Sequence, residues 1–186
     1  MNAEGGLRIE LTSVDSAVMR VNIESHRPVH ASRVMIGRHL ADSQRMIPLL
    51  FHLCATAQAC AGVRACEQAL DKPASAAVQK MRDQLVNVET LREHLWRIYL
   101  DWPAFIDAEA EPEKAEMAEM LQIQRDYQQA FCPHDGLFQA GATTCRSDLA
   151  ALKKASDRLS GLLQRTLFAM PPEEWLALAG EQQHLS

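Results

Sequence analysis

The feature that most constrains the fold is a long apolar stretch from Ile47 to Leu70, IPLLFHLCATAQACAGVRACEQAL. It begins beside Pro48, a residue that the first turn of a helix tolerates, and it stops at Asp71-Lys72-Pro73, where a proline ends a helix. The stretch therefore predicts one long helix. Polar residues interrupt it, so no uninterrupted apolar segment reaches the roughly 20 residues that cross a bilayer.

Three of the five cysteines lie in this stretch, at Cys54, Cys60 and Cys66. A spacing of six residues turns a helix by roughly 240°, so the three thiols point in different directions and cannot bind one metal. Each is expected to be a small buried side chain in an Ala-rich helix. An odd number of cysteines without a CxxC pair indicates reduced thiols and a cytoplasmic protein.

The composition is typical of a soluble globular protein, with 47% hydrophobic and 23% charged residues. The net charge of −5 and the lack of clustered Lys and Arg argue against nucleic-acid binding. The first residues, MNAEGGLRIELTSVD, do not have the pattern of a secretory signal. The oligomeric state stays open.

Alternating apolar and polar residues mark the N-terminal part as β structure. The segments 7–11 and 18–23 both alternate, and Ser13 to Ser16 supply turn residues between them. This pattern predicts an antiparallel β-hairpin within residues 1–30, packed on a helical domain of residues 31–186, with a single domain overall. An isolated hairpin is marginal in water, so it needs a body or a further strand to cover it.

The rest of the chain predicts helices with apolar residues every three or four positions. Gly37 is expected to cap a short turn or helix over 31–40, and Asp42 or Ser43 to cap the segment after it. The further helices are predicted over 75–100, ended by Trp102-Pro103, then over 115–131, over 147–170 with Ser147 as its N-cap, and from Pro171 onward. The fold class is therefore mainly α, a helix bundle with an N-terminal β-hairpin.

Catalytic motifs are missing from the sequence. It has no Gly-rich phosphate loop, no GxSxG, no HExxH and no pair of CxxC motifs, so the chain is not expected to be an enzyme. Glu89, Glu93 and His94 lie close in sequence, but their spacing is not that of a Glu-x-x-His metal site. His94 borders an apolar stripe and is expected to be a core or inter-helix residue.

The segment Cys132-Pro133-His134-Asp135-Gly136 breaks the helical pattern. Its Pro, Asp and Gly are typical of a tight turn between two helices. Cys132 and His134 are also residue types that bind zinc. A turn and a metal site both remain open here.

Two segments carry a resemblance to a known family. LCATAQACAGVRACEQAL resembles the part of nickel-iron hydrogenase large subunits around R-x-C-G-x-C-P-x-A-H-x-x-A-x-x-R-A-x-E, with Cys54 on the second cysteine and Gln58 on the histidine. Arg64 and Glu67 fall on the downstream R-A-x-E. VETLREHLWRIYLDWPAF is similar to the helix S-H-x-x-H-F-Y-x-L-x-x-P-D, with His94 on its first histidine, and GLRIEL looks like the opening strand.

The chain departs from those enzymes at their metal ligands. Phe51 stands where the first cysteine would be, and the sequence has no D-P-C-x-x-C, so two pairs of thiolates for nickel and iron are not present. The pattern, including RPVHASRVMIGR, is more similar to the HupK/HoxV type of hydrogenase expression and assembly protein, a degenerate relative of the large subunit. The resemblance covers about residues 7–107. It implies part of the large-subunit fold, and the chain is expected to be a short relative or to lack a C-terminal part.

The resemblance implies an accessory role in hydrogenase maturation. The chain would be a scaffold or chaperone that transiently holds an Fe(CN)2CO fragment, or a protein carrying it, with the large-subunit precursor and other maturation proteins as partners. Cys54 would give the iron one thiolate ligand, a partner would complete its coordination, and Gln58, four residues on, would assist it. Arg64, Glu67 and His94 would act around the site or contact a partner.

Three hypotheses follow. The first is this maturation scaffold. The second is a helical interaction or structural subunit, related to large subunits, whose cysteines have no metal role. The third is a metalloenzyme that uses Cys132 and His134.

Overall fold

A computed structural model describes residues 6–15, 17–26, 30–105, 114–131, 136–144 and 146–183. The chain divides into two compact units, residues 1–46 and residues 47–186. The predicted boundary near residue 30 and the packing of the hairpin on the body stay predictions. Each unit is described by itself below.

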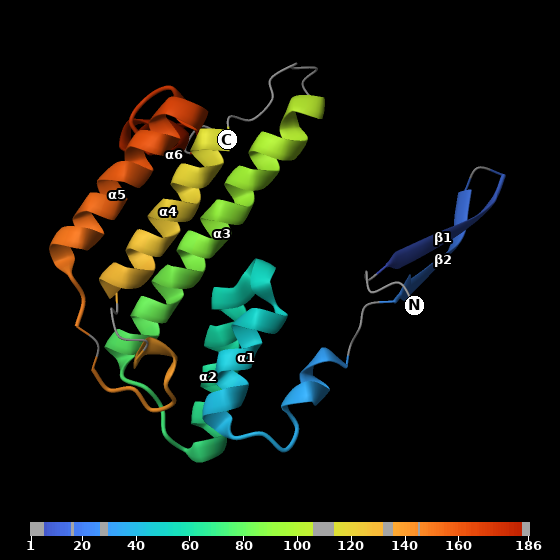
Figure 1. Cartoon of the computed structure of the whole chain (residues 1–186). Coiled ribbons are helices and arrows are strands. Elements are labelled where there is room, and N and C mark those ends of the chain that lie inside the picture. Colours follow the sequence, from blue (N-terminus) through green and yellow to red (C-terminus); the bar gives the residue numbers. More distant parts are fainter. Residues whose placement is uncertain are drawn as a thin grey trace. The chain divides into compact units, whose positions relative to one another are not determined.

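The first unit contains the predicted β-hairpin. Strands β1 (Leu7–Val14) and β2 (Ala17–Ser25) pair antiparallel, with Ile9 opposite Ile23 (Figure 1). Asp15 in the turn has a φ of 50°, a left-handed conformation that Asp adopts more readily than most residues. The 3-10 turn η1 (Ala31–Met35) follows, and Gly37 has the positive φ of 78° that its predicted capping role requires. The hairpin prediction is confirmed.

Helices make up the second unit. Figure 1 shows α3 (Ala76–Phe105), α4 (Lys114–Phe131) and α5 (Leu149–Leu163) side by side, and α2 (Ala55–Leu70) packs against α3. Helix α1 (Leu40–Leu50) precedes α2, a π-helical turn η4 (Gln164–Phe168) continues α5, and α6 (Pro172–Gln183) ends the described chain. The mainly α fold class is confirmed.

Two clusters of apolar side chains hold α3, α4 and α5 together. The larger joins the three helices through Val88, Leu95, Tyr99, Met120, Ile123 and Leu162. The smaller joins the start of α3 to the segment after α4 through Val78, Leu85 and Leu137. The members that α3 contributes to the two clusters are three, four or seven residues apart, which places them on one side of the helix, as the sequence pattern predicts.

The prediction of one helix from Ile47 to Leu70 is wrong. The chain bends by 100° between α1 and the segment His52–Leu70, and a short 3-10 turn, η2 (His52–Cys54), lies at the bend. Pro48 lies inside α1 rather than at a helix start. Gly62 of α2 allows the bend to close tightly, because a Cβ atom at Gly62 would lie 2.4 Å from Cδ1 of Ile47.

Most other helix bounds agree with the sequence. Helix α2 ends at Leu70, and Asp71 follows in a left-handed conformation with a φ of 50°. Three details of the predicted helix ends and caps are wrong. Asp42 and Ser43 lie inside α1 and do not cap it, α3 runs through Pro103 to Phe105, and Asp148 rather than Ser147 caps α5 by accepting from the amide of Ala151.

Within the described residues, no single helix is long and apolar enough to cross a membrane. The segments Leu40–Leu50 and His52–Leu70 reach the length and apolar composition of a membrane span only when they are counted together, and the chain bends by 100° between them.

Candidate functional site

Cys54 is the last residue of the 3-10 turn η2, directly before α2. It is exposed, and its backbone (φ −116°, ψ 42°) is outside the α-helical region, so Cys54 is the N-cap residue of α2 rather than part of that α-helix. Its side chain accepts no capping hydrogen bond from α2. The prediction that Cys54 is buried in a helix is wrong, and its thiol is accessible to a ligand or partner.

Helix α3 holds this turn through two charged side chains. The Glu89 carboxylate accepts from the amides of Thr56 and Ala57, both at 2.8 Å, and the Arg92 guanidinium donates to the carbonyl of Leu53 at 2.7 Å. In a continuous helix, the Ala57 amide would donate to the Leu53 carbonyl. Both groups are instead bonded to α3, which explains why the chain bends at this point.

The side chains of Glu89 and Arg92, which hold the turn, are themselves buried. Glu89 is 3% exposed and Arg92 is 7% exposed. Arg92 also donates to Gln124 of α4 at 2.8 Å and to Glu93, and its guanidinium lies over the Trp96 ring, 5.1 Å from the centroid. The turn that carries Cys54 is therefore held by a network that spans α3 and α4.

Exposed aliphatic side chains flank the turn. Leu49 at the end of α1 is 78% exposed, and Leu53, next to Cys54, is 62% exposed. Leu50 is less exposed, at 39%. Large apolar side chains beside an accessible thiol are typical of a surface that contacts another protein.

Gln58 lies on the first turn of α2 and is half-buried. Across the described part of the chain, Gln58 makes no hydrogen bond to Cys54, and no three His, Cys, Asp or Glu side chains converge as metal ligands do. A metal at Cys54 would need ligands from elsewhere. The ligand role of Cys54 and the supporting role of Gln58 stay predictions.

Arg64 and Glu67 lie farther along α2, roughly 14 and 18 Å from its first residue at 1.5 Å per residue. Exposed Arg64 donates to Asp83 at 2.6 Å and to Gln79 at 2.9 Å. Glu67 is buried and accepts from both terminal nitrogens of Arg82, at 2.9 and 3.0 Å. These contacts are with α3, so the structure does not bring Arg64 or Glu67 to the thiol of Cys54.

The Glu67–Arg82 pair also fixes the segment after α4. The Gly141 amide donates to Glu67 at 3.1 Å, and Arg82 donates to the carbonyls of Leu137 and Gln139 at 2.6 and 3.2 Å. Arg82 is completely buried. The pair therefore joins α2, α3 and the segment 136–144, and it supports the fold rather than the Cys54 turn.

These contacts hold the pKa of Glu67 below its ordinary value of 4.5. Burial alone would raise it, but hydrogen bonds from Arg82 and the Gly141 amide outweigh burial. The unfolded chain then takes up the proton first as pH falls, so the stabilisation is complete above about pH 4.5 and is lost as the pH drops through the lower folded-state pKa. The free energy of unfolding, measured by urea denaturation, should fall less steeply with acid in Glu67→Gln than in the wild type. Equal acid dependence in the two proteins would contradict this prediction.

The buried structural roles of Arg82, Glu89 and Arg92 were not predicted from the sequence, where Glu89 was considered only as part of a metal site. Each lies in register with the buried positions of α3, three or four residues from Val78, Leu85 or Leu95. Charged residues that recur in step with an apolar stripe are the signal that could have found them, because a buried charge needs a partner.

The other two cysteines of α2 differ from Cys54. Cys60 is 2% exposed, and burial raises the pKa of its thiol from 9.0 to about 11, although the positive charges of Arg64 and Arg82 oppose the rise. Cys60 therefore stays a neutral thiol at pH 7, as expected of a core cysteine. Cys66 is half-buried.

The remaining predicted site residues lie elsewhere. His94 is exposed on α3, so its predicted place in the core is wrong. It follows buried Arg92 by two residues, which turns its side chain roughly 200° away from the packed side of the helix. Cys132 and His134 fall outside the described residues, so their predicted metal site stays a prediction.

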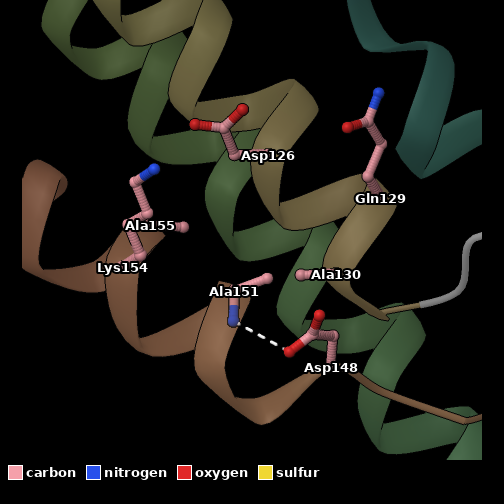
Figure 2. A pocket seen from close by; sticks show the side chains of 7 residues that line it. All are labelled: Asp126, Gln129, Ala130, Asp148, Ala151, Lys154 and Ala155. Atoms are coloured by element: carbon pink, nitrogen blue, oxygen red, sulfur yellow. Dashed lines mark hydrogen bonds between the residues drawn. The ribbon is translucent and has the colours of Figure 1, made fainter.

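A shallow groove of about 340 Å³ lies between α4 and α5 (Figure 2). The dashed line in Figure 2 marks the Asp148 cap on the Ala151 amide. The acidic residue Asp126 in the groove is paired with Arg158 at 2.5 Å. No predicted site residue lines this groove, which is formed by Asp126, Gln129, Ala130, Asp148, Ala151, Lys154 and Ala155.

Comparisons with known proteins bear on the resemblance. The chain is 36% identical over 99 residues to the hydrogenase expression/formation protein HupK of Azotobacter vinelandii, and 35% identical over 99 residues to the hydrogenase expression/formation protein HupV of Azotobacter chroococcum mcd 1. Each match covers 53% of this chain and 29% of the relative. No family model and no solved structure matches the chain. The resemblance to hydrogenase expression/formation proteins is therefore confirmed over about half of the chain, which spans less than a third of the length of these relatives.

Proposed function

We propose that this chain is a non-catalytic accessory protein in the formation of a nickel-iron hydrogenase. The similarity to two hydrogenase expression/formation proteins supports this role. The chain would act as a scaffold or chaperone for the large-subunit precursor or for another maturation protein.

Exposed Cys54 is the observation that carries the more specific part of the proposal. Its thiol is accessible on a turn that Glu89 and Arg92 hold in place, with apolar Leu49 and Leu53 beside it. A thiolate is a soft ligand that suits low-valent iron. Cys54 would supply one ligand to an Fe(CN)2CO fragment as cargo, and a partner docked on the neighbouring leucines would supply the rest.

The lone thiol also favours the second candidate function. Since no cluster of metal-ligating side chains forms within the described segments, a helical interaction protein without a metal role fits the same surface. The two candidates agree on protein contacts and differ on whether Cys54 binds iron.

Replacing Cys54 by Ala tests this difference. The protein is purified from cells that form a nickel-iron hydrogenase, and infrared spectra of the eluate are recorded. Cyanide and carbonyl stretching bands are expected in the wild type and should be lost in Cys54→Ala, while the fold stays intact because an exposed side chain is removed. Cys66→Ala, which removes a half-buried thiol farther along α2, is the matched control and should keep the bands.

Three other outcomes would change the assignment. Bands that persist in Cys54→Ala would exclude this thiol as the ligand. Co-purifying large-subunit precursor without bands would favour the interaction protein. If the eluate showed no bands and contained no hydrogenase-related partner, that result would contradict the accessory role itself.

A further inference from the structure

Helix α2 contributes little to the apolar core of the second unit. Among the residues that the structure describes, neither of the two apolar clusters contains a side chain of α2. The apolar residues that α2 buries are Ala59, Cys60 and Val63, all of which are small. Because hydrophobic stabilisation grows with the apolar area removed from water, α3, α4 and α5 hold one another more strongly than they hold α2.

Charged and polar groups make most of the contacts between α2 and α3 instead. Glu89 and Arg92 bind backbone groups at the start of α2 and in the turn before it. Farther along, Arg82 pairs with Glu67 at 2.9 and 3.0 Å. The Gln79 amide also donates to Glu67, at 3.0 Å. The two helices are therefore joined mainly by ion pairs and hydrogen bonds.

Water can replace these polar contacts when the two helices separate. A buried ion pair gives up hydration that offsets much of its electrostatic attraction, and both charges regain that hydration in the separated state. Separation therefore costs less free energy than the number of polar contacts suggests. Replacing one partner of a pair is different, because it leaves the other charge buried and unpaired.

The chain on both sides of α2 allows the helix to move as one piece with the turn before it. Ile47, near the end of α1, packs closely on Gly62 of α2, so the two would stay together. After α2, the Ser75 amide donates to the Ala142 carbonyl at 3.0 Å, which fixes the start of α3. A hinge between α2 and α3 would therefore lie at residues 71–73.

We propose that residues 47–70 form a releasable segment, which detaches from α3 as a unit while α3, α4 and α5 stay packed. Contiguous units with few buried apolar contacts to the rest of a protein open in this way before the whole chain unfolds. Release separates the turn that carries Cys54 from Glu89 and Arg92, so the thiol alternates between a fixed and a free position. A partner that binds the released segment shifts the population toward release. The inference rests on contacts within the second unit and is independent of the proposed role in hydrogenase formation.

Cys60 is a probe of this release within the chain itself. It is 2% exposed, and its Sγ atom lies 3.8 Å from the Arg82 carbonyl oxygen of α3, so a thiol reagent reaches it only after α2 has left α3. The measurement uses the full chain with Cys54→Ala and Cys66→Ala, and peptide mass spectrometry follows the labelling of Cys60 over a range of urea concentrations. Urea denaturation of the same protein gives the equilibrium constant for global unfolding.

Labelling of Cys60 is expected to be about tenfold or more faster than global unfolding allows. It should also depend less on urea than global unfolding does, because release exposes less surface than unfolding. Labelling at the rate set by global unfolding, with the same urea dependence, would overturn the proposal.

Two further variants of this protein separate release from global unfolding. Leu162→Ala removes a fully buried side chain from the larger apolar cluster and should raise the unfolding equilibrium constant about a hundredfold, yet change the labelling of Cys60 less than about threefold. Glu67→Gln weakens contacts that only the attached segment makes, so it should speed labelling about tenfold or more. Labelling that accelerates as much as unfolding in Leu162→Ala, or that is unchanged in Glu67→Gln, would contradict a releasable segment.

Discussion

Replacing Arg82 by Met is expected to lower the free energy of unfolding by about 3–5 kcal/mol, because it leaves a buried charge without its partner. Arg82 is completely buried and donates to both carboxylate oxygens of Glu67. Its loss would also leave the carbonyl of Leu137 without the donor that lies 2.6 Å away. Urea denaturation of the purified protein measures the change.

The matched control is Arg64→Met. Arg64 also pairs with a carboxylate, Asp83, but both side chains are about half exposed, at 42% and 56%. Exposed pairs contribute roughly 0–1 kcal/mol, so this variant should be nearly as stable as the wild type. Similar losses in the two variants would contradict the assignment of a buried pair at Arg82.

Coupling between the two partners can be measured directly. The double variant of Arg82→Met and Glu67→Gln should lose less stability than the sum of the two single variants, because neither leaves a charge unpaired once both are replaced. Additive losses would mean that the two side chains stabilise the fold independently.

Replacing Glu89 by Ala should cost about 2–4 kcal/mol and loosen the turn that carries Cys54. The carboxylate accepts from the amides of Thr56 and Ala57 at 2.8 Å, and each buried amide left without an acceptor costs about 1–3 kcal/mol. Hydrogen exchange should therefore speed up most over residues 52–58, and urea denaturation should give the loss in stability.

Asp101→Ala is the control for this variant. Asp101 lies farther along α3 and pairs with Arg97 at 3.1 Å, and both side chains are exposed, at 44% and 62%. Its removal should cost about 1 kcal/mol or less and leave the exchange of residues 52–58 nearly unchanged. If both variants loosened the turn equally, the backbone contacts of Glu89 would not be what holds it.

Much of the fold follows from local sequence patterns. Alternation over 7–11 and 18–23 predicts β1 and β2, and spacings of three and four predict α3 and α4, because these periods follow from the geometry of strands and helices. The end of α2 follows from Asp71-Lys72-Pro73. The N-caps of α1 and α5 do not follow from the sequence, since neighbouring polar residues such as Ser147 and Asp148 are equally suited to an N-cap.

The sequence and its family resemblance also singled out Cys54, but the surroundings of Cys54 come from tertiary structure. The apolar, Ala-rich run from Ile47 to Leu70 predicts a continuous helix with a buried thiol. In the fold, Glu89 binds the amides of Thr56 and Ala57, and Arg92 binds the carbonyl of Leu53. These partners lie more than thirty residues away in sequence, so no local period reveals them, and they decide that the helix breaks and that Cys54 faces solvent.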